Sequence, residues 1–289
     1  DMWTQVIDIE LPPIIKFERP SGGSEAIKEA AKLLSNADFP VILSGAGVVL
    51  ADAINDCKAL AEKLDSPVAS GYQHNDSFPG SHPLAVGPLG YNGSKAAMEL
   101  ISKADVVLAL GTRLNPFSTL PGYGIDYWPK DAAIIQVDIN SDRIGLTKKV
   151  SVGICGDAKQ VAQQLLNSLS PEAGNKNRDE RKALIHQTKS AWLQTLSSMD
   201  HEDDDPGTSW NEEARVRDAD RMSPRMAWRA IQNGLPKNAI ISSDIGNNCA
   251  IGNAYPTFEE GRKYLAPGLF GPCGYGFPSV LGAKIGCPN

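Results

Sequence analysis

The stretch PVILSGAGVVLA, residues 40–51, decides the fold class. It opens with a short apolar run, which two glycines close before a second apolar run begins. This arrangement is typical of a buried strand that turns directly into a helix. A strand that is apolar along its whole length, rather than at alternate positions, indicates a parallel sheet covered on both faces.

The same alternation continues along the chain. Before the opening stretch, Ile27, Ala30, Ala31 and Leu34 have the spacing of one helix face. After it come three further apolar runs, ADVVLALGTRL (104–114), AAIIQVDIN (132–140) and VSVGICGD (150–157). Strands that alternate with helices indicate an α/β domain. We therefore assign residues 23–170 to one Rossmann-like domain with a parallel sheet.

The length of 289 residues suggests two domains. Residues 1–22 are proline-rich and without periodicity, as expected for a linker from a preceding domain. Residues 171–222 form a polar inter-domain segment, in which the acidic run 203–205 is interpreted as a solvated loop rather than a cation site. Residues 223–289 begin with a predicted helix at 223–233 and are interpreted as a second α/β domain.

The composition excludes several classes of function. The net charge of −6 comes without a dense basic stripe, so nucleic acid and anionic membranes are not the expected partners. No apolar run reaches the 18 or so residues of a membrane span, and we expect a cytoplasmic protein. The five cysteines are odd in number and lack metal-ligand spacing, which indicates reduced thiols.

The GAGVVLA turn raises a nucleotide-binding alternative. The motif stands between a strand and a helix, as a dinucleotide fingerprint does, but Leu50 occupies the place of the third glycine. Asp138 ends a predicted strand where a ribose ligand would lie, although not at the usual spacing. We favour a structural role for these glycines and keep a non-catalytic nucleotide-binding module as the alternative.

His74 and His82 lie in a long glycine- and proline-rich stretch. A histidine there is a candidate general acid or base. No nucleophile arrangement accompanies either residue, so we interpret both as hydrogen-bonded structural histidines. Arg113 and Arg262 are candidate anion contacts without an assigned role.

Two segments near the C-terminus favour a phosphate-bearing, flat ligand. SSDIGNN (242–248) places a strand end, a glycine and a helix start in succession, so that main-chain N–H groups and the helix dipole face an anion. GPCGYGFPSVLGAKIG (271–286) adds glycines that let the backbone approach a ligand without a Cβ atom in the way. The two segments together are more specific than either alone.

The ordered combination VILSGAG, HPLAVGPLG, DVVLALGTRL, IIQVDIN, ICGDAKQV, SSDIGNN and GPCGYGFPSVLGAKIG resembles the thiamine-diphosphate-dependent enzymes related to acetolactate synthase and pyruvate oxidase. The resemblance covers essentially the whole chain. It implies thiamine diphosphate and Mg²⁺ as cofactors, and a homodimer or homotetramer with the cofactor between subunits. The cofactor-contacting residues that it implies are Ile245, Gly246, Asn247, Asn248, Gly271, Cys273 and Gly274.

In this resemblance residues 245–248 hold the cofactor diphosphate. The Gly271 carbonyl accepts from the 4′-amino group, and Cys273 offers its backbone N–H to the pyrimidine. The Cys273 side chain stands where relatives commonly place a bulkier residue, and we expect it to pack rather than to react, since no His or Lys stands beside it in sequence to activate a thiol.

Within the family, stretches such as WNEEARVRDADRMSPRMAWRAIQ (210–232) are most similar to the branch that converts sulfoacetaldehyde and phosphate to acetyl phosphate and sulfite. Acetolactate-synthase-like carboligation is the alternative. The resemblance also implies that the chain is a fragment: the activating glutamate belongs to a preceding domain, and the metal-binding GDG motif lies beyond Asn289. We expect this chain alone to be inactive, and it offers no metal ligands of its own.

Overall fold

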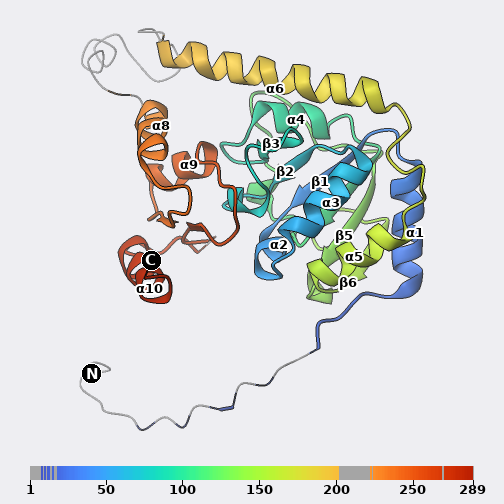
Figure 1. Ribbon diagram of the computed structural model, residues 1–289, viewed down its shortest axis with the longest axis horizontal. Coiled ribbons are helices and arrows are strands. Elements are labelled where there is room, and N and C mark those ends of the chain that lie inside the picture. Colours follow the sequence, from blue (N-terminus) through green and yellow to red (C-terminus); the bar gives the residue numbers. More distant parts are fainter. Residues whose placement is uncertain are drawn as a thin grey trace.

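The computed structural model describes residues 8, 10, 12, 13, 15, 18–201, 222, 224–268 and 270–288, with only the backbone described at 199–201. Figure 1 shows a central α/β domain and a smaller part made by residues 224–288. Most of the predicted linker, the acidic run 203–205 and Ser223 lie outside the described residues.

A six-stranded parallel sheet forms the central domain, in the order β3-β2-β1-β4-β5-β6. The strands are β1 (Pro40–Ser44), β2 (Val68–Ser70), β3 (Ala85–Pro88), β4 (Val106–Leu110), β5 (Ala133–Asp138) and β6 (Val152–Cys155). Every residue of β1 and β4 is buried, as the continuous apolar runs predicted. The α/β fold class and the parallel sheet are confirmed.

Strand β3 was not predicted, because it lies inside the glycine- and proline-rich stretch that includes both loop histidines. It occupies the edge of the sheet, where a proline at the end of a strand is tolerated. Its register with β2 shifts between Val68 and Ala69. Such an irregular edge strand leaves no alternating pattern to read in the sequence.

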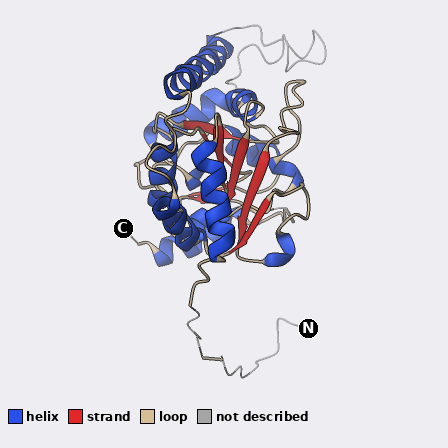
Figure 2. Ribbon diagram, turned by 90° about the vertical axis from the view of Figure 1, so that its right-hand side faces the viewer, coloured by secondary structure: helices blue, strands red, loops and turns tan. Residues whose placement is uncertain are grey.

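Helices cover both faces of the sheet (Figure 2). In the central domain they are α1 (Ser24–Asn36), α2 (Ala46–Leu50), α3 (Ile54–Leu64), α4 (Lys95–Ile101) and α5 (Ala158–Ser168). α1 and α3 both contact α5 and share its layer. The chain runs outward through the sheet from β1 to β3 and then returns to β4. The helix of this return, α4, therefore lies on the face of the sheet opposite to α1, α3 and α5. The direction therefore reverses between β1 and β4, at the edge where ligands of such folds bind.

Helix α6 (Arg178–His201) packs along the central domain and contacts α4 (Figure 1). The fully buried Arg181 anchors its start. Its guanidinium donates to five backbone carbonyls, those of Asp38, Leu64, Asp65, Gly174 and Lys176. The first half of the polar segment 171–222 is thus attached to the central domain.

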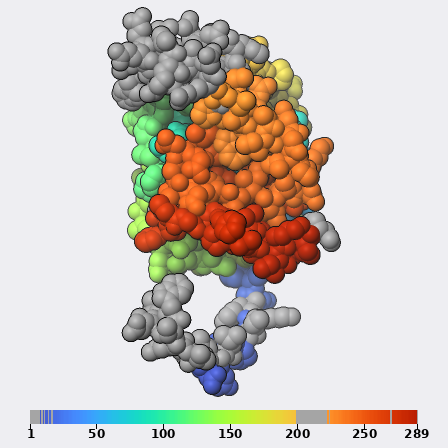
Figure 3. Space-filling view, turned by 90° about the vertical axis from the view of Figure 1, so that its left-hand side faces the viewer, coloured from blue at the N-terminus to red at the C-terminus, as the bar shows by residue number. Residues whose placement is uncertain are grey.

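The smaller part contains α8 (Pro224–Gly234), β7 (Ile241–Ser242), α9 (Asn247–Ala254), β8 (Tyr264–Leu265) and α10 (Gly276–Gly286). β7 and β8 pair in parallel, which agrees with a second α/β unit. The helix predicted at 223–233 is α8, whereas the strand that was predicted to end within SSDIGNN (242–248) is β7, which is regular over only two residues. Figure 3 shows this part, in orange and red, as one continuous layer over the face of the molecule turned to the viewer.

Candidate functional site

The predicted diphosphate segment forms the turn between β7 and α9. Gly246 caps α9 with φ +118°, a conformation that L side chains rarely adopt. Gly246, Asn247 and Asn248 are exposed, and among the described residues no acceptor is bonded to their main-chain N–H groups. Free N–H groups at a helix start attract anions. The segment therefore has the donors that a diphosphate requires.

The predicted pyrimidine segment lies directly beside it. A Cβ atom built on Gly271 would stand 3.0 Å from Cδ1 of Ile245, so the two segments meet although 26 residues separate them. Gly274 has φ +86° with nothing within 4 Å of its missing Cβ atom. Cys273 is a free, exposed cysteine between the two glycines. The structure brings together all seven residues that the resemblance implies.

Asp244 joins the two segments and was not among the predicted site residues. Its carboxylate accepts hydrogen bonds from the N–H groups of Ile245 at 2.8 Å, Gly274 at 3.0 Å and Gly276 at 3.0 Å. These bonds, that of Gly276 foremost, lower the pKa of Asp244. The available sequence signal was an aspartate between a strand end and a glycine turn, where side-chain to main-chain bonds are common.

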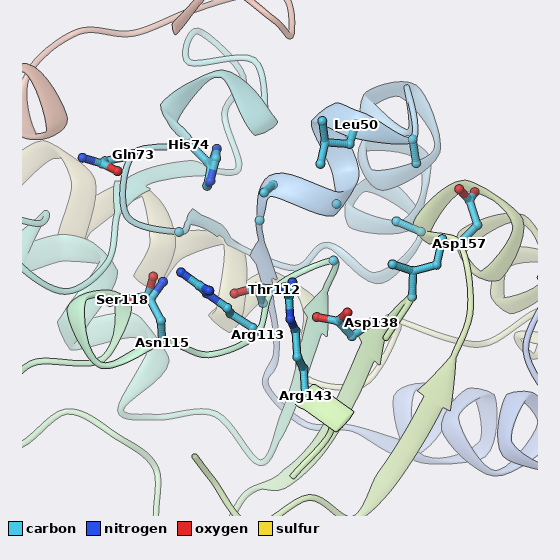
Figure 4. Close-up of a pocket in the computed structure, with 18 of the residues that line it drawn as sticks. Leu50, Gln73, His74, Thr112, Arg113, Asn115, Ser118, Asp138, Arg143 and Asp157 are labelled. Carbon is cyan, nitrogen blue, oxygen red and sulfur yellow. Dashed lines mark hydrogen bonds between the residues drawn. The ribbon is translucent and has the colours of Figure 1, made fainter. Parts of the chain in front are cut away.

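A cavity of about 460 Å³ opens at the carboxyl edge of the central sheet. The ends of β1, β4 and β5 line it together with the loop that follows β2. Figure 4 shows Arg113, Asp138 and Arg143 among its lining side chains, with Gln73 and His74 across from them. The guanidinium groups of Arg113 and Arg143 form no hydrogen bond or ion pair with any described residue. The cavity thus presents two positively charged side chains that are not paired with a carboxylate among the described residues.

The glycines of the GAGVVLA turn have a structural role, as predicted. A Cβ atom on Gly45 would lie 2.6 Å from the Gly111 carbonyl oxygen, and one on Gly47 would lie 2.6 Å from the Gly111 Cα atom. Both distances are too short for any real Cβ atom. The turn after β1 therefore packs backbone against backbone on the turn after β4.

The two loop histidines differ. The His82 ring lies 3.2 Å from Oε1 of Glu62 and accepts from the N–H of Leu84, so its hydrogen-bonded structural role is confirmed. The His74 ring makes no hydrogen bond to any described residue and lines the cavity, which departs from the prediction. Burial, and then the charge of Arg113, lower the pKa of His74 to about 4, so this histidine is neutral near pH 7.

The loop after β2 links the cavity to the smaller part of the molecule. Next to His74, the Gln73 N–H donates to the side-chain oxygen of Asn253 in α9, and Asn75 Nδ2 donates to the Asn253 carbonyl. Oδ2 of Asp76 accepts from the N–H groups of Lys263 and Tyr264. Burial raises the pKa of Asp76. α9, whose first turn carries the diphosphate segment, is therefore held at its other end by a loop of the central domain.

Two kinds of feature are absent from the part of the chain that the structure describes. Within the described ranges, no group of three or more His, Cys, Asp or Glu side chains could hold a metal ion. None of the helices in these ranges combines the length and the apolar character that crossing a membrane requires. Arg262, the other candidate anion contact, donates to the Leu50 carbonyl and joins the smaller part to α2.

Comparison with known proteins gives the family. The chain matches the thiamine pyrophosphate enzyme central domain over residues 27–165, and the C-terminal TPP-binding domain over residues 244–289. A probable sulfoacetaldehyde acetyltransferase of Rhizobium meliloti (strain 1021) is 79% identical over all of this chain and 49% of its own length. The sulfoacetaldehyde acetyltransferase of Roseovarius nubinhibens is 77% identical over all of this chain and 48% of its own length.

A probable acetolactate synthase large subunit of Methanocaldococcus jannaschii is 33% identical over 98% of this chain and 46% of its own length. The chain thus spans about half the length of the curated relatives it matches. The two family matches together cover more than half of the chain, and they fall on the two parts that the structure shows, so the chain belongs to the thiamine pyrophosphate enzymes.

Proposed function

We propose that the chain is part of a thiamine-diphosphate-dependent acetyltransferase that converts sulfoacetaldehyde and phosphate to acetyl phosphate and sulfite. The observation that carries the proposal is the identity of 79% and 77%, across the whole chain, to two relatives that are named for the acetyltransferase. Identity to the acetolactate synthase relative is 33%, which favours the acetyltransferase over the carboligase.

The proposed roles of the site residues follow from their main chain. The free N–H groups of residues 246–248 bind the cofactor diphosphate, as helix starts bind phosphate groups. The Gly271 carbonyl orients the pyrimidine through its 4′-amino group, and the Cys273 N–H makes a second contact with the ring. Thiamine diphosphate, when bound, supplies a carbon nucleophile and an electron sink that no side chain offers. The chain's contribution is to bind and orient.

Further features belong to the same proposal. We assign residues 1–22 as a linker, 23–170 as the central domain, 171–222 as an inter-domain segment and 223–289 as part of the diphosphate-binding domain. The two family matches lie within the second and fourth ranges. The proposal also includes Mg²⁺ as the second cofactor and a location in the cytoplasm. A homodimer or homotetramer is supported by the exposed apolar side chains on α10, namely Phe277, Leu281 and Ile285.

The test uses the complete gene product with thiamine diphosphate, Mg²⁺, sulfoacetaldehyde and phosphate. We expect sulfite and acetyl phosphate to appear in equal amounts. Pyruvate, offered in a parallel reaction, should not be consumed. If pyruvate is consumed and sulfoacetaldehyde yields no sulfite, the acetyltransferase assignment is wrong and the carboligase is favoured. We also expect the 289-residue chain alone to release no sulfite.

As a second candidate function, we propose that the cavity of the central domain binds a nucleotide through its phosphate groups. Support comes from Arg113 and Arg143, which line the cavity and form no ion pair with an acidic side chain among the described residues. The cavity also lies where the strand order reverses. Calorimetry of the 289-residue chain with ADP and with FAD tests this function. No heat of binding from either nucleotide, or the same heat from an Arg113→Gln variant, would contradict it.

A further inference from the structure

Asp244 occupies the position between the two cofactor segments. It lies two residues after the end of β7, and its two carboxylate oxygens accept from one N–H group beside it and from two others, 30 and 32 residues further along the chain. Oδ1 accepts from the N–H groups of both Ile245 and Gly274, and Oδ2 accepts from the N–H group of Gly276. One side chain thus fixes the main chain of both segments.

The approach of the second segment is close. A Cβ atom on Gly276 would stand 3.2 to 3.4 Å from atoms of Asp244, which is tighter than most real contacts. A second polar contact keeps the same elements together, since the Ser242 and Ser279 hydroxyls lie 2.7 Å apart between β7 and α10. The distance between the segments therefore depends more on polar contacts, chiefly the main-chain bonds to Asp244, than on apolar packing, as most of α10 is exposed.

The charge of Asp244 has the wrong sign for direct recognition of a diphosphate. A carboxylate beside two phosphate groups repels them, so it does not attract the cofactor. Its three N–H donors instead stabilise the ionised form, and they lower its pKa. A carboxylate with this set of partners has the chemistry of a main-chain anchor.

We propose that Asp244 is a positioning residue that sets the separation of the diphosphate segment, residues 245–248, from the pyrimidine segment, residues 271–274. The inference rests on the proposed function, because it concerns how a thiamine diphosphate molecule would be spanned. Without the carboxylate, the N–H groups of Gly274 and Gly276, at the end of the pyrimidine segment and just beyond it, lose the acceptor that fixes them. The Gly271 carbonyl and the Cys273 N–H then no longer stand at a set distance from residues 246–248.

The informative variant is Asp244→Asn, which keeps the size of the side chain but turns one acceptor into an NH₂ donor that faces an N–H group. The matched control is Glu259→Gln, because Glu259 also accepts a main-chain N–H, that of Ser81, but at the boundary with the central domain. Two properties of the complete gene product are measured. One is the dissociation constant of thiamine diphosphate; the other is hydrogen exchange in a peptide that covers residues 272–277.

We expect Asp244→Asn to weaken cofactor binding by about tenfold and to speed exchange in this peptide by at least a similar factor, as for loss of a hydrogen bond to a charged group. Saturating thiamine diphosphate should restore most of the turnover number, which loss of folded protein would not allow. The control should change neither property. Unchanged cofactor affinity in Asp244→Asn, beside a wild type that binds, overturns the inference. If the wild type binds no thiamine diphosphate, the proposed function is contradicted instead. In that case, exchange in the 272–277 peptide of Asp244→Asn that is as slow as in the wild type would still refute the positioning role of Asp244.

Discussion

Replacement of Asn253 by alanine tests how the smaller part is held on the central domain. The Asn253 side chain is fully buried. Its oxygen accepts from the Gln73 N–H at 2.5 Å, and its amide nitrogen donates to the Tyr91 carbonyl at 3.1 Å. The variant therefore loses two hydrogen bonds and leaves one main-chain donor and one acceptor without their partner.

The expected loss of stability follows from these two bonds. A neutral hydrogen bond contributes about 1 kcal/mol, and a buried group left without a partner costs about 1–3 kcal/mol. Water that enters the space of the missing side chain would satisfy part of this deficit. We therefore expect the free energy of unfolding to fall by about 2–4 kcal/mol.

Urea denaturation of the 289-residue chain measures this change, and hydrogen exchange shows where it acts. Exchange of the Gln73 amide should become faster, whereas that of the β1 amides should change less, because β1 is buried and paired on both sides. Asn36→Ala is the control, since this exposed asparagine donates only to Lys32 in its own helix. A loss below about 0.5 kcal/mol in Asn253→Ala, the range of ordinary surface substitutions, would refute the reasoning.

Three further predictions concern the central domain. Arg181→Met should lower the free energy of unfolding by about 3 kcal/mol or more in urea denaturation, because five carbonyls lose their donor; a loss under about 1 kcal/mol would contradict this. Gly111→Ala should lower the melting temperature in thermal denaturation clearly more than Gly145→Ala. Both glycines have positive φ, but a Cβ atom at position 111 would lie 2.7 Å from the Gly47 Cα atom, whereas nothing lies within 4 Å of one at position 145. Equal losses in the two variants would show that the turn at Gly111 relaxes freely. His74→Gln should flatten the pH dependence of the urea midpoint between pH 6.5 and about 4. In this range the folded chain keeps His74 neutral while the unfolded chain protonates it, so the stability that neutral His74 contributes is present above pH 6.5 and is lost as the pH falls. An unchanged slope in the variant would contradict the lowered pKa.

The central fold could be predicted because its signals are local. β1, β4 and β5 are continuous apolar runs, and each coincides with a strand buried along nearly its whole length. β3 escaped prediction for the opposite reason. It is short, irregular in register and placed at an edge, so that its partner β2 rather than its own composition determines it.

The site residues were predicted from family motifs, while the residues that hold them were not. Asp244 acts on amides 30 and 32 residues away, and Asn253 acts on a loop residue 180 positions earlier. Such partners leave no periodicity and no spacing rule in a single sequence. His74 shows the same limit, since its lowered pKa depends on burial and on Arg113, which the fold alone brings near it.

The glycines of the two regions show why similar motifs in one chain have different meanings. Gly45, Gly47 and Gly111 are explained by crowding, because a Cβ atom at any of them would collide with main-chain atoms of the facing turn. No ligand is needed to account for them. Gly274 is exposed and has open space where its Cβ atom would be, so its positive φ alone requires glycine. That φ directs an N–H group toward Asp244, and the space left beside it is free for a ligand. The second glycine cluster therefore supports direct contact with a ligand, whereas the nucleotide proposed for the central cavity would depend on Arg113 and Arg143 and not on the first cluster.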